Sequence, residues 1–446
     1  MSGTTDAVLK FPVAVSCFAA QRMLGVLPLV GDWEPVRAAQ KSLYERGEEA
    51  KKSFSDNTML FGAFQFGDKA QSALASLAED TMSLKVLKPS YMMDFVSDVF
   101  KGSTDAVDAV STGDARSLLQ DQFKNTGDVI GFVNNNDAPR TLADDGSYPL
   151  EAEVERCYAR GDYPALWLVE GLGERYAEAF LDAGWETRGL LTNEPVTALP
   201  AKIQLMMHAG AGIAFAKHEV GPLNPWSTET EIRAALERFL DLVRESSMPG
   251  YEGAALESLG LVTRTWYPQM VSLISDNLLA VDVNAREYFW HGAGRAMYFS
   301  PMNMLPGLSP WDAADKEPSD EIAKLNARAG VAWAFTIVNV RQPGIASNFL
   351  RHKADRIKDN DAYTNGVHST LVMAGDMVPG HRYVAEFCAH KPDASDTAAV
   401  DAWTAHIGSD IQGQIDQYRE TLRTHGKLGE VFRFHALPDF IADLGL

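Results

Sequence analysis

Five ionisable side chains lie beside glycine-rich stretches in the C-terminal two-thirds of this 446-residue chain: Glu170, His208, Glu252, His291 and Arg295. A histidine with a carboxylate nearby can act as a general base, as a metal ligand or as a hydrogen-bonded core pair. His291 and Arg295 are four residues apart, so they share one face of a helix. If the glycines meet in the fold, these five residues become our candidate catalytic set.

Two of these residues, His208 and His291, stand in matching contexts, because each comes just before a Gly-Ala-Gly run. Non-covalent haem needs one or two axial ligands in an apolar, often helical pocket. His208 and His291 are therefore candidate haem-binding residues, although a histidine on an apolar helix is more often part of the core. No zinc, phosphate-loop or serine-hydrolase motif is complete in the chain, and we assign no metal-ligand set.

The glycine-rich stretches themselves recur at a nearly constant spacing. Successive central glycines are 39, 43, 39, 38 and 36 residues apart, at Gly171, Gly210, Gly253, Gly292, Gly330 and Gly366. A fixed period of this size is typical of helical repeats that bury their apolar faces against one another. Large residues five positions later, such as Tyr176, Phe215 and Phe335, are expected in the core.

Glycine inside a helix costs about 1 kcal/mol relative to alanine, so the repeated glycines need a physical reason. Close packing of two helix backbones is the commoner reason, and a flat ligand lying against the helix is the other. The two Gly-x-Gly fragments at Gly210 and Gly292 lack the third glycine and the preceding strand of a dinucleotide-binding fold. The pattern therefore favours close-packed helices.

The chain divides into three parts by pattern. Residues 1–133 form an N-terminal helical region, residues 134–150 a polar linker, and residues 151–446 a repeat-like helical domain with glycine-rich, close-packed helices. The fold class is mainly all-α, with strands minor or absent. Apolar residues at three- and four-residue spacings predict one amphipathic helix over 228–244, with Thr228 or Thr230 as its N-cap.

Composition limits the possible functions. The net charge of −20 argues against binding to a nucleic-acid backbone. Three scattered cysteines do not make a disulfide framework, and we see no secretory signal or apolar run that could span a membrane. We therefore expect a cytoplasmic protein with no nucleic-acid partner and no transmembrane segment.

Residues 165–391 resemble a bacterial family of unknown activity that is associated with enediyne polyketide biosynthesis clusters. The stretches that carry the resemblance are Leu168 to Gly173, Met207 to Ala214, Gly292 to Phe299 and Ala329 to Ala334. Their order and spacing are similar to that family's succession of glycine-rich helices. The resemblance implies a link to polyketide- or lipid-like products without naming a reaction.

Three functions remain open at this point. The first is the binding, or the binding and modification, of a hydrophobic polyketide- or lipid-like molecule in a helical pocket, with the five polar residues orienting it. The second is a haem- or metal-dependent oxidoreductase that uses His208 and His291. The third is a scaffold whose N-terminal helices associate with a granule or membrane surface, and homo-oligomerisation is open in each case.

Overall fold

The computed structural model describes residues 137–445, apart from residues 186, 300–309, 358–360 and 410, together with isolated positions between 121 and 132. These residues belong to one compact unit, Gly113–Phe299 with Pro310–Leu446. The predicted N-terminal region, 1–133, lies almost entirely outside them. Residues 137–149, most of the predicted linker, contain turns and irregular backbone but no helix.

The described part of the chain is all-α and contains no strand, which confirms the predicted fold class. Its first helices are α7 (Leu150–Ala159), α8 (Asp162–Asp182), α9 (Ala201–Val220), α10 (Glu229–Ser246), α11 (Glu252–Trp266), α12 (Val271–Val281) and α13 (Val283–Tyr298). The later helices are α14 (Pro310–Lys316), α15 (Glu321–Asn339), α16 (Pro343–Ile357), α17 (Ala362–Met377), α18 (Arg382–Ala389), α19 (Thr397–His406), α20 (Gln412–Thr424) and α21 (Leu437–Leu444). Short 3₁₀ turns lie at η3 (Val196–Ala198), η4 (Pro268–Met270) and η5 (Leu428–Phe432).

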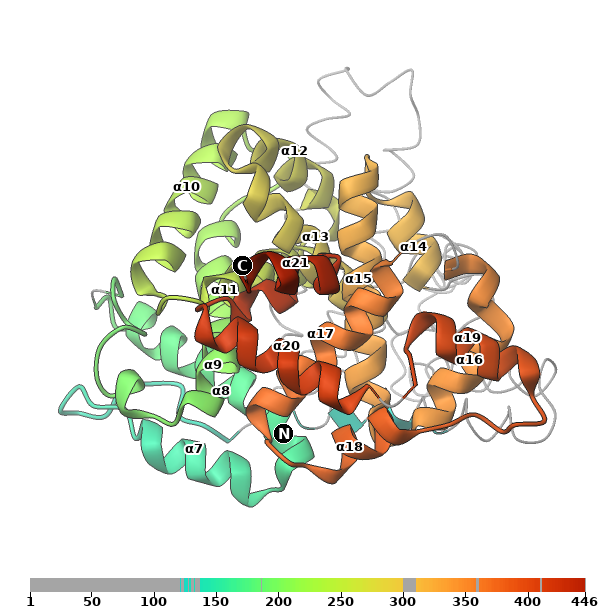
Figure 1. Ribbon diagram of the computed structural model, residues 1–446. Coiled ribbons are helices and arrows are strands. Elements are labelled where there is room, and N and C mark those ends of the chain that lie inside the picture. Colours follow the sequence, from blue (N-terminus) through green and yellow to red (C-terminus); the bar gives the residue numbers. More distant parts are fainter. Residues whose placement is uncertain are drawn as a thin grey trace, which may run out of the picture. The chain divides into compact units, whose positions relative to one another are not determined.

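Six of these helices form a consecutive series in which each packs on the next. The order is α8, α9, α11, α13, α15 and α17, and Figure 1 shows it running from the green helices to the orange ones. The series also curves back on itself, because α17 packs on α9. In addition, the hydroxyl of Tyr163 in α8 donates a hydrogen bond of 2.9 Å to the carbonyl of Val338 in α15. Glu170, His291 and Arg295, three of the candidate residues from the sequence, lie on helices of this series.

Glycines allow the close contacts along this series. A methyl group on Gly210 would clash with the backbone carbonyl of Glu170, and one on Gly292 would clash with that of Glu257. Gly173, Gly212, Gly260, Gly294, Gly330 and Gly366 meet the backbone of a neighbouring helix in the same way. Since no side chain larger than hydrogen fits at these crossings, the predicted close packing through glycine is confirmed.

The glycine-rich stretch at the start of α11 packs differently from the others. Gly253 lies against Gly429 of η5 and the Tyr288 ring, whereas Gly260, seven residues later, makes the crossing with α13. Ser258 lies five positions after Gly253, where other repeats carry a large side chain, and it donates a 2.7 Å hydrogen bond to the carbonyl of Ala209 in α9. The inward-facing part of α11 therefore lies about two turns beyond the position that the 40-residue period indicates.

Local sequence explains where the helices begin. Thr228 caps α10 in a capping box, because its hydroxyl accepts from the Glu231 amide at 3.2 Å and the Glu231 carboxylate accepts from the Thr228 amide at 2.7 Å. The amphipathic helix predicted over 228–244 is thus confirmed, with Thr228 as its cap. Asp282 and Asp320 cap α13 and α15 through their side-chain oxygens.

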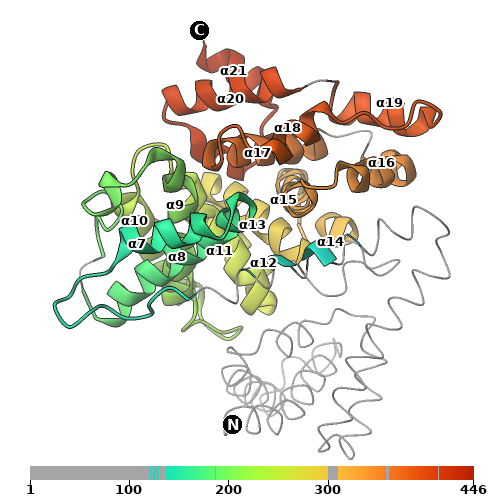
Figure 2. The same ribbon diagram turned by 90° about the horizontal axis from the view of Figure 1, so that it is seen from below.

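The remaining helices cover the series from outside. Helices α10 and α12 pack on each other, and α10 also packs on α9 while α12 packs on α13. Figure 2 shows α18 to α21 gathered on one side of the series, where α20 packs on α17. The predicted core residues Tyr176, Phe215 and Phe335 are all buried.

Candidate functional site

Four side chains from three helices of this glycine-packed series form a buried polar network. They are Glu170 of α8, Glu257 of α11, and His291 and Arg295 of α13, and we call them the buried quartet. Arg295 donates from one terminal nitrogen to Glu170 at 2.9 Å and from the other to Glu257 at 2.9 Å. Nδ1 of His291 donates to the second oxygen of Glu257 at 3.0 Å.

The glycine crossings bring these residues together. The carbonyls of Glu170, Glu257 and His291 are the ones against which Gly210, Gly292 and Gly330 of the following helices pack. Each of these three quartet residues also lies three positions before a crossing glycine of its own helix, namely Gly173, Gly260 and Gly294. Residues three apart share a helix face, so the same face carries the close contact and the polar group.

Burial decides the electrostatics of the quartet. The side chains of Glu257 and His291 are 0% exposed, that of Arg295 is 2% and that of Glu170 is 8%. Burial raises the pKa of Glu170 and lowers the pKa of His291, because each charged form loses its water. Burial alone would lower the pKa of Arg295, but the carboxylates of Glu170 and Glu257 outweigh it and the pKa is raised.

Two aromatic rings form a wall against the quartet. The guanidinium carbon of Arg295 lies 4.5 Å from the ring centroid of Trp333 in α15 and 5.8 Å from that of Phe432 in η5. The ring of His291 meets the same two rings edge to face, at centroid distances of 6.4 and 6.2 Å. The quartet is therefore bordered by aromatic surface, a combination common in small-molecule sites.

Three buried nitrogen atoms at this wall have no hydrogen-bond partner among the described residues. They are Nε2 of His291, Nε of Arg295 and Nε1 of Trp333. Because Nδ1 of His291 donates to Glu257, Nε2 carries a lone pair and can accept a proton or a hydrogen bond. A carboxylate that orients an imidazole in this way is the arrangement of a general base.

The structure brings together three of the five residues that the sequence indicated: Glu170, His291 and Arg295. It places His208 apart from the quartet. Nδ1 of His208 donates to the carbonyl of Gln204 at 2.7 Å, Nε2 accepts from the Met248 amide at 3.0 Å, and the ring stacks on Tyr251. Burial lowers the pKa of His208 to about 4. Both ring nitrogens are thus occupied, so binding an iron atom would break one of these bonds.

Glu252 is also outside the quartet. It is the first residue of α11, its side chain is 46% exposed, and it lies 3.7 Å from Arg244 in a surface ion pair. The inward-facing acid of α11 is Glu257, which the sequence analysis did not single out. A signal for it existed, because Glu-x-Leu-Gly occurs both at Glu170 to Gly173 and at Glu257 to Gly260.

Among the described residues, no group of three or more histidine, cysteine, aspartate or glutamate side chains is arranged to hold a metal ion. The quartet does not offer such a group, since the guanidinium of Arg295 lies between its two carboxylates. The part of the chain that the structure describes also contains no helix long and apolar enough to cross a membrane.

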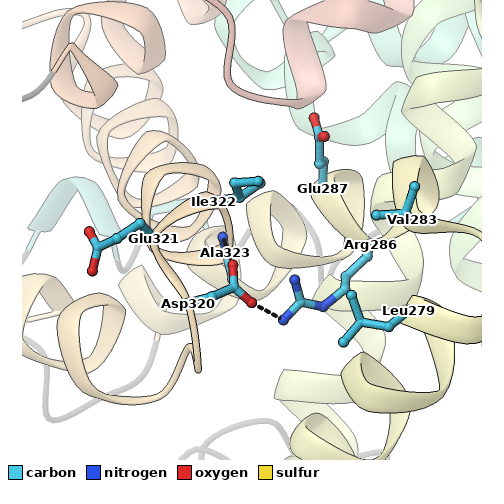
Figure 3. Close-up of a pocket in the computed structure, with 8 residues that line it drawn as sticks. All are labelled: Leu279, Val283, Arg286, Glu287, Asp320, Glu321, Ile322 and Ala323. Carbon is cyan, nitrogen blue, oxygen red and sulfur yellow. Dashed lines mark hydrogen bonds and ion pairs between the residues drawn. The ribbon is translucent and has the colours of Figure 1, made fainter.

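A second feature is an apolar depression at the surface between α12, α13 and the start of α15 (Figure 3). Three aliphatic side chains are half exposed there: Leu279 at 52%, Val283 at 57% and Ile322 at 58%. Beside them the guanidinium of Arg286 and the carboxylate of Asp320 form an ion pair of 2.6 Å. The other residues that line the apolar depression are Glu287, Glu321 and Ala323.

The chain matches no known family model, no curated protein and no solved structure.

Proposed function

We propose that this protein binds a hydrophobic small molecule of the polyketide- or lipid-like class, and that the buried quartet holds the polar group of that molecule. The observation that carries the proposal is the buried quartet itself, with the open nitrogen positions of His291 and Arg295 beside an aromatic wall. Apolar and aromatic surface with a few convergent polar groups is the usual composition of a small-molecule site.

Stability alone is a poor reason for such a quartet. Removing charged groups from water costs more than their attraction returns unless the geometry is excellent, and hydrophobic replacements are often neutral or stabilising. The quartet and its aromatic border also hold buried nitrogens that no described residue satisfies, a feature that an apolar core would not have. Recognition of a polar group on an otherwise apolar ligand gives both features a purpose. The resemblance of residues 165–391 to the enediyne-associated family supports the choice of ligand class.

Native mass spectrometry of the full chain, followed by solvent extraction, tests this proposal. We expect a co-purifying apolar molecule whose occupancy falls in His291→Asn. Asparagine keeps a donor at the position of Nδ1, toward Glu257, and removes the group at Nε2. The matched control is His208→Asn, which alters a buried histidine outside the quartet and should leave the occupancy unchanged. An empty wild-type chain, or equal loss in both variants, would overturn the proposal.

A second candidate function is self-association through the apolar depression. The observation that favours it is that three of the four exposed large apolar side chains among the described residues gather there. Sedimentation over a concentration series should then show an oligomer that Ile322→Lys dissociates. Ala183→Lys adds the same charge at an exposed position outside the apolar depression and should have no effect. A wild-type chain that is monomeric throughout would remove this candidate.

A further inference from the structure

We infer that the group recognised by the buried quartet is an uncharged hydroxyl, and that neither a carboxylate nor an ammonium group takes its place. The inference rests on the proposed function, because it names the chemistry of the ligand for the same site. It follows from two features of the quartet. The first is that its two nitrogens without a partner, Nε of Arg295 and Nε2 of His291, are a donor and an acceptor. The second is the sum of its charges.

The two open nitrogens are of opposite kinds. Nε of Arg295 is always a donor, because the guanidinium is not deprotonated in proteins. Nε2 of His291 is an acceptor, since Nδ1 holds the ring proton and donates it to Glu257 at 3.0 Å. The two residues are one turn apart on α13, and both lie against the rings of Trp333 and Phe432. Their open atoms therefore offer one donor and one acceptor on α13, and Nε1 of Trp333 is a second open donor at the same aromatic wall.

Only a group that both donates and accepts satisfies this pair. A hydroxyl can donate to His291 and accept from Arg295. An ionised carboxylate accepts only, so it would place a lone pair against the lone pair of His291. An ammonium group donates only and would oppose the N–H of Arg295. The imidazole keeps its acceptor because burial lowers the pKa of His291 and so favours the neutral ring.

The charge sum argues further against a carboxylate, whereas the argument against an ammonium group rests on the N–H of Arg295 alone. With Glu170 and Glu257 ionised, Arg295 positive and His291 neutral, the quartet carries one net negative charge. Its side chains are at most 8% exposed, so water screens this charge poorly. A carboxylate ligand would add a second negative charge, whereas a hydroxyl adds none. If a proton is held on Glu170, the quartet is neutral, and a carboxylate would still bring an uncompensated charge into the interior.

The test compares three probes that share a decyl chain: 1-decanol, decanoate and decylammonium. Each is titrated into the full chain near neutral pH and followed by calorimetry and native mass spectrometry. We expect 1-decanol to bind about tenfold or more tighter than either charged probe, since buried groups built to pair with a hydroxyl reject ligands that leave them unpaired. We also expect His291→Asn to lose this preference and His208→Asn to keep it.

The outcomes separate the inference from the proposed function. Binding of decanoate or decylammonium at least as tightly as 1-decanol, with the binding lost in His291→Asn, would overturn the hydroxyl assignment and leave the ligand site standing. Binding of none of the probes, or binding of all three that His291→Asn does not alter, would overturn the site and the inference with it. The comparison of probes on the wild-type chain holds even if the variant fails to fold.

Discussion

Glu170 and Arg295 are 125 positions apart in the sequence, yet their side chains form an ion pair of 2.9 Å in the interior. The pair joins α8, the first helix of the glycine-packed series, to α13, the fourth. Arg295 reaches Glu257 of α11 at the same distance, so a single guanidinium links three helices. The position of each of these side chains depends on the close glycine crossings, which makes packing and polar chemistry parts of one arrangement.

Replacing Glu257 by alanine should destabilise the protein strongly. The substitution removes a buried partner from both Arg295 and His291, and loss of one member of a buried ion pair costs about 3–5 kcal/mol. The control is Glu252→Ala on the same helix, where an exposed side chain should change the free energy of unfolding by about 0.5 kcal/mol or less. Urea denaturation of the two variants measures both values. Similar losses in the two variants would show that the quartet does not hold the helices together.

The glycine crossings give a prediction of opposite sign for two helical glycines. Gly292→Ala places a methyl group against the carbonyl of Glu257, and overpacking of this kind costs about 1–3 kcal/mol, more than the gain in helix propensity. Gly413→Ala in α20 meets no atom of the described residues within 4 Å and should stabilise by about 0.5–1 kcal/mol. Thermal unfolding should therefore move in opposite directions, and a stabilised Gly292→Ala variant would contradict the close packing.

The sequence predicted the architecture well because glycine periodicity reports directly on how closely helices approach. It predicted the quartet only in part. The spacing between the glycine-rich stretches placed the inward face of α11 at Gly253. In the structure Gly253 contacts η5, and Gly260 makes the crossing with α13. Because of this shift, the acid of α11 that faces the interior is the fully buried Glu257, while Glu252 lies at the exposed start of the helix.

His208 shows a different limit of sequence reasoning. Its context, a histidine ahead of Gly-Ala-Gly on an apolar helix, matches that of His291. Their hydrogen bonding differs because of residues distant in the sequence: the Met248 amide, 40 positions away, occupies Nε2 of His208, whereas Nε2 of His291 has no partner among the described residues. Local pattern gives the helix and its buried face, and only tertiary packing decides which buried histidine is left with a free nitrogen.

The cap of α10 offers a local test of helix stability. Thr228→Ala removes the side-chain acceptor of the capping box and should cost about 0.5–2 kcal/mol of unfolding free energy. Thr230→Ala, two residues later, changes an exposed threonine inside the same helix and should cost about 0.5 kcal/mol or less. Chemical denaturation compares the two. A larger loss in Thr230→Ala than in Thr228→Ala would place the start of the helix elsewhere.

His208 should make the stability of the protein depend on pH. Its pKa is about 4 in the folded chain, against an ordinary histidine value of about 6.5 in the unfolded chain. Between these values the unfolded chain binds a proton that the folded chain does not, so stability falls as the pH falls from about 6.5 to about 4. The loss attributable to this residue is about 3 kcal/mol, and it is complete below the folded pKa.

Denaturation at a series of pH values measures how the free energy of unfolding depends on pH. The slope of this dependence should be shallower in His208→Asn, which cannot titrate, than in the wild type. His218→Asn changes an exposed histidine on the same helix and should keep the wild-type slope. An unchanged slope in His208→Asn would mean that burial of the ring does not keep this imidazole neutral.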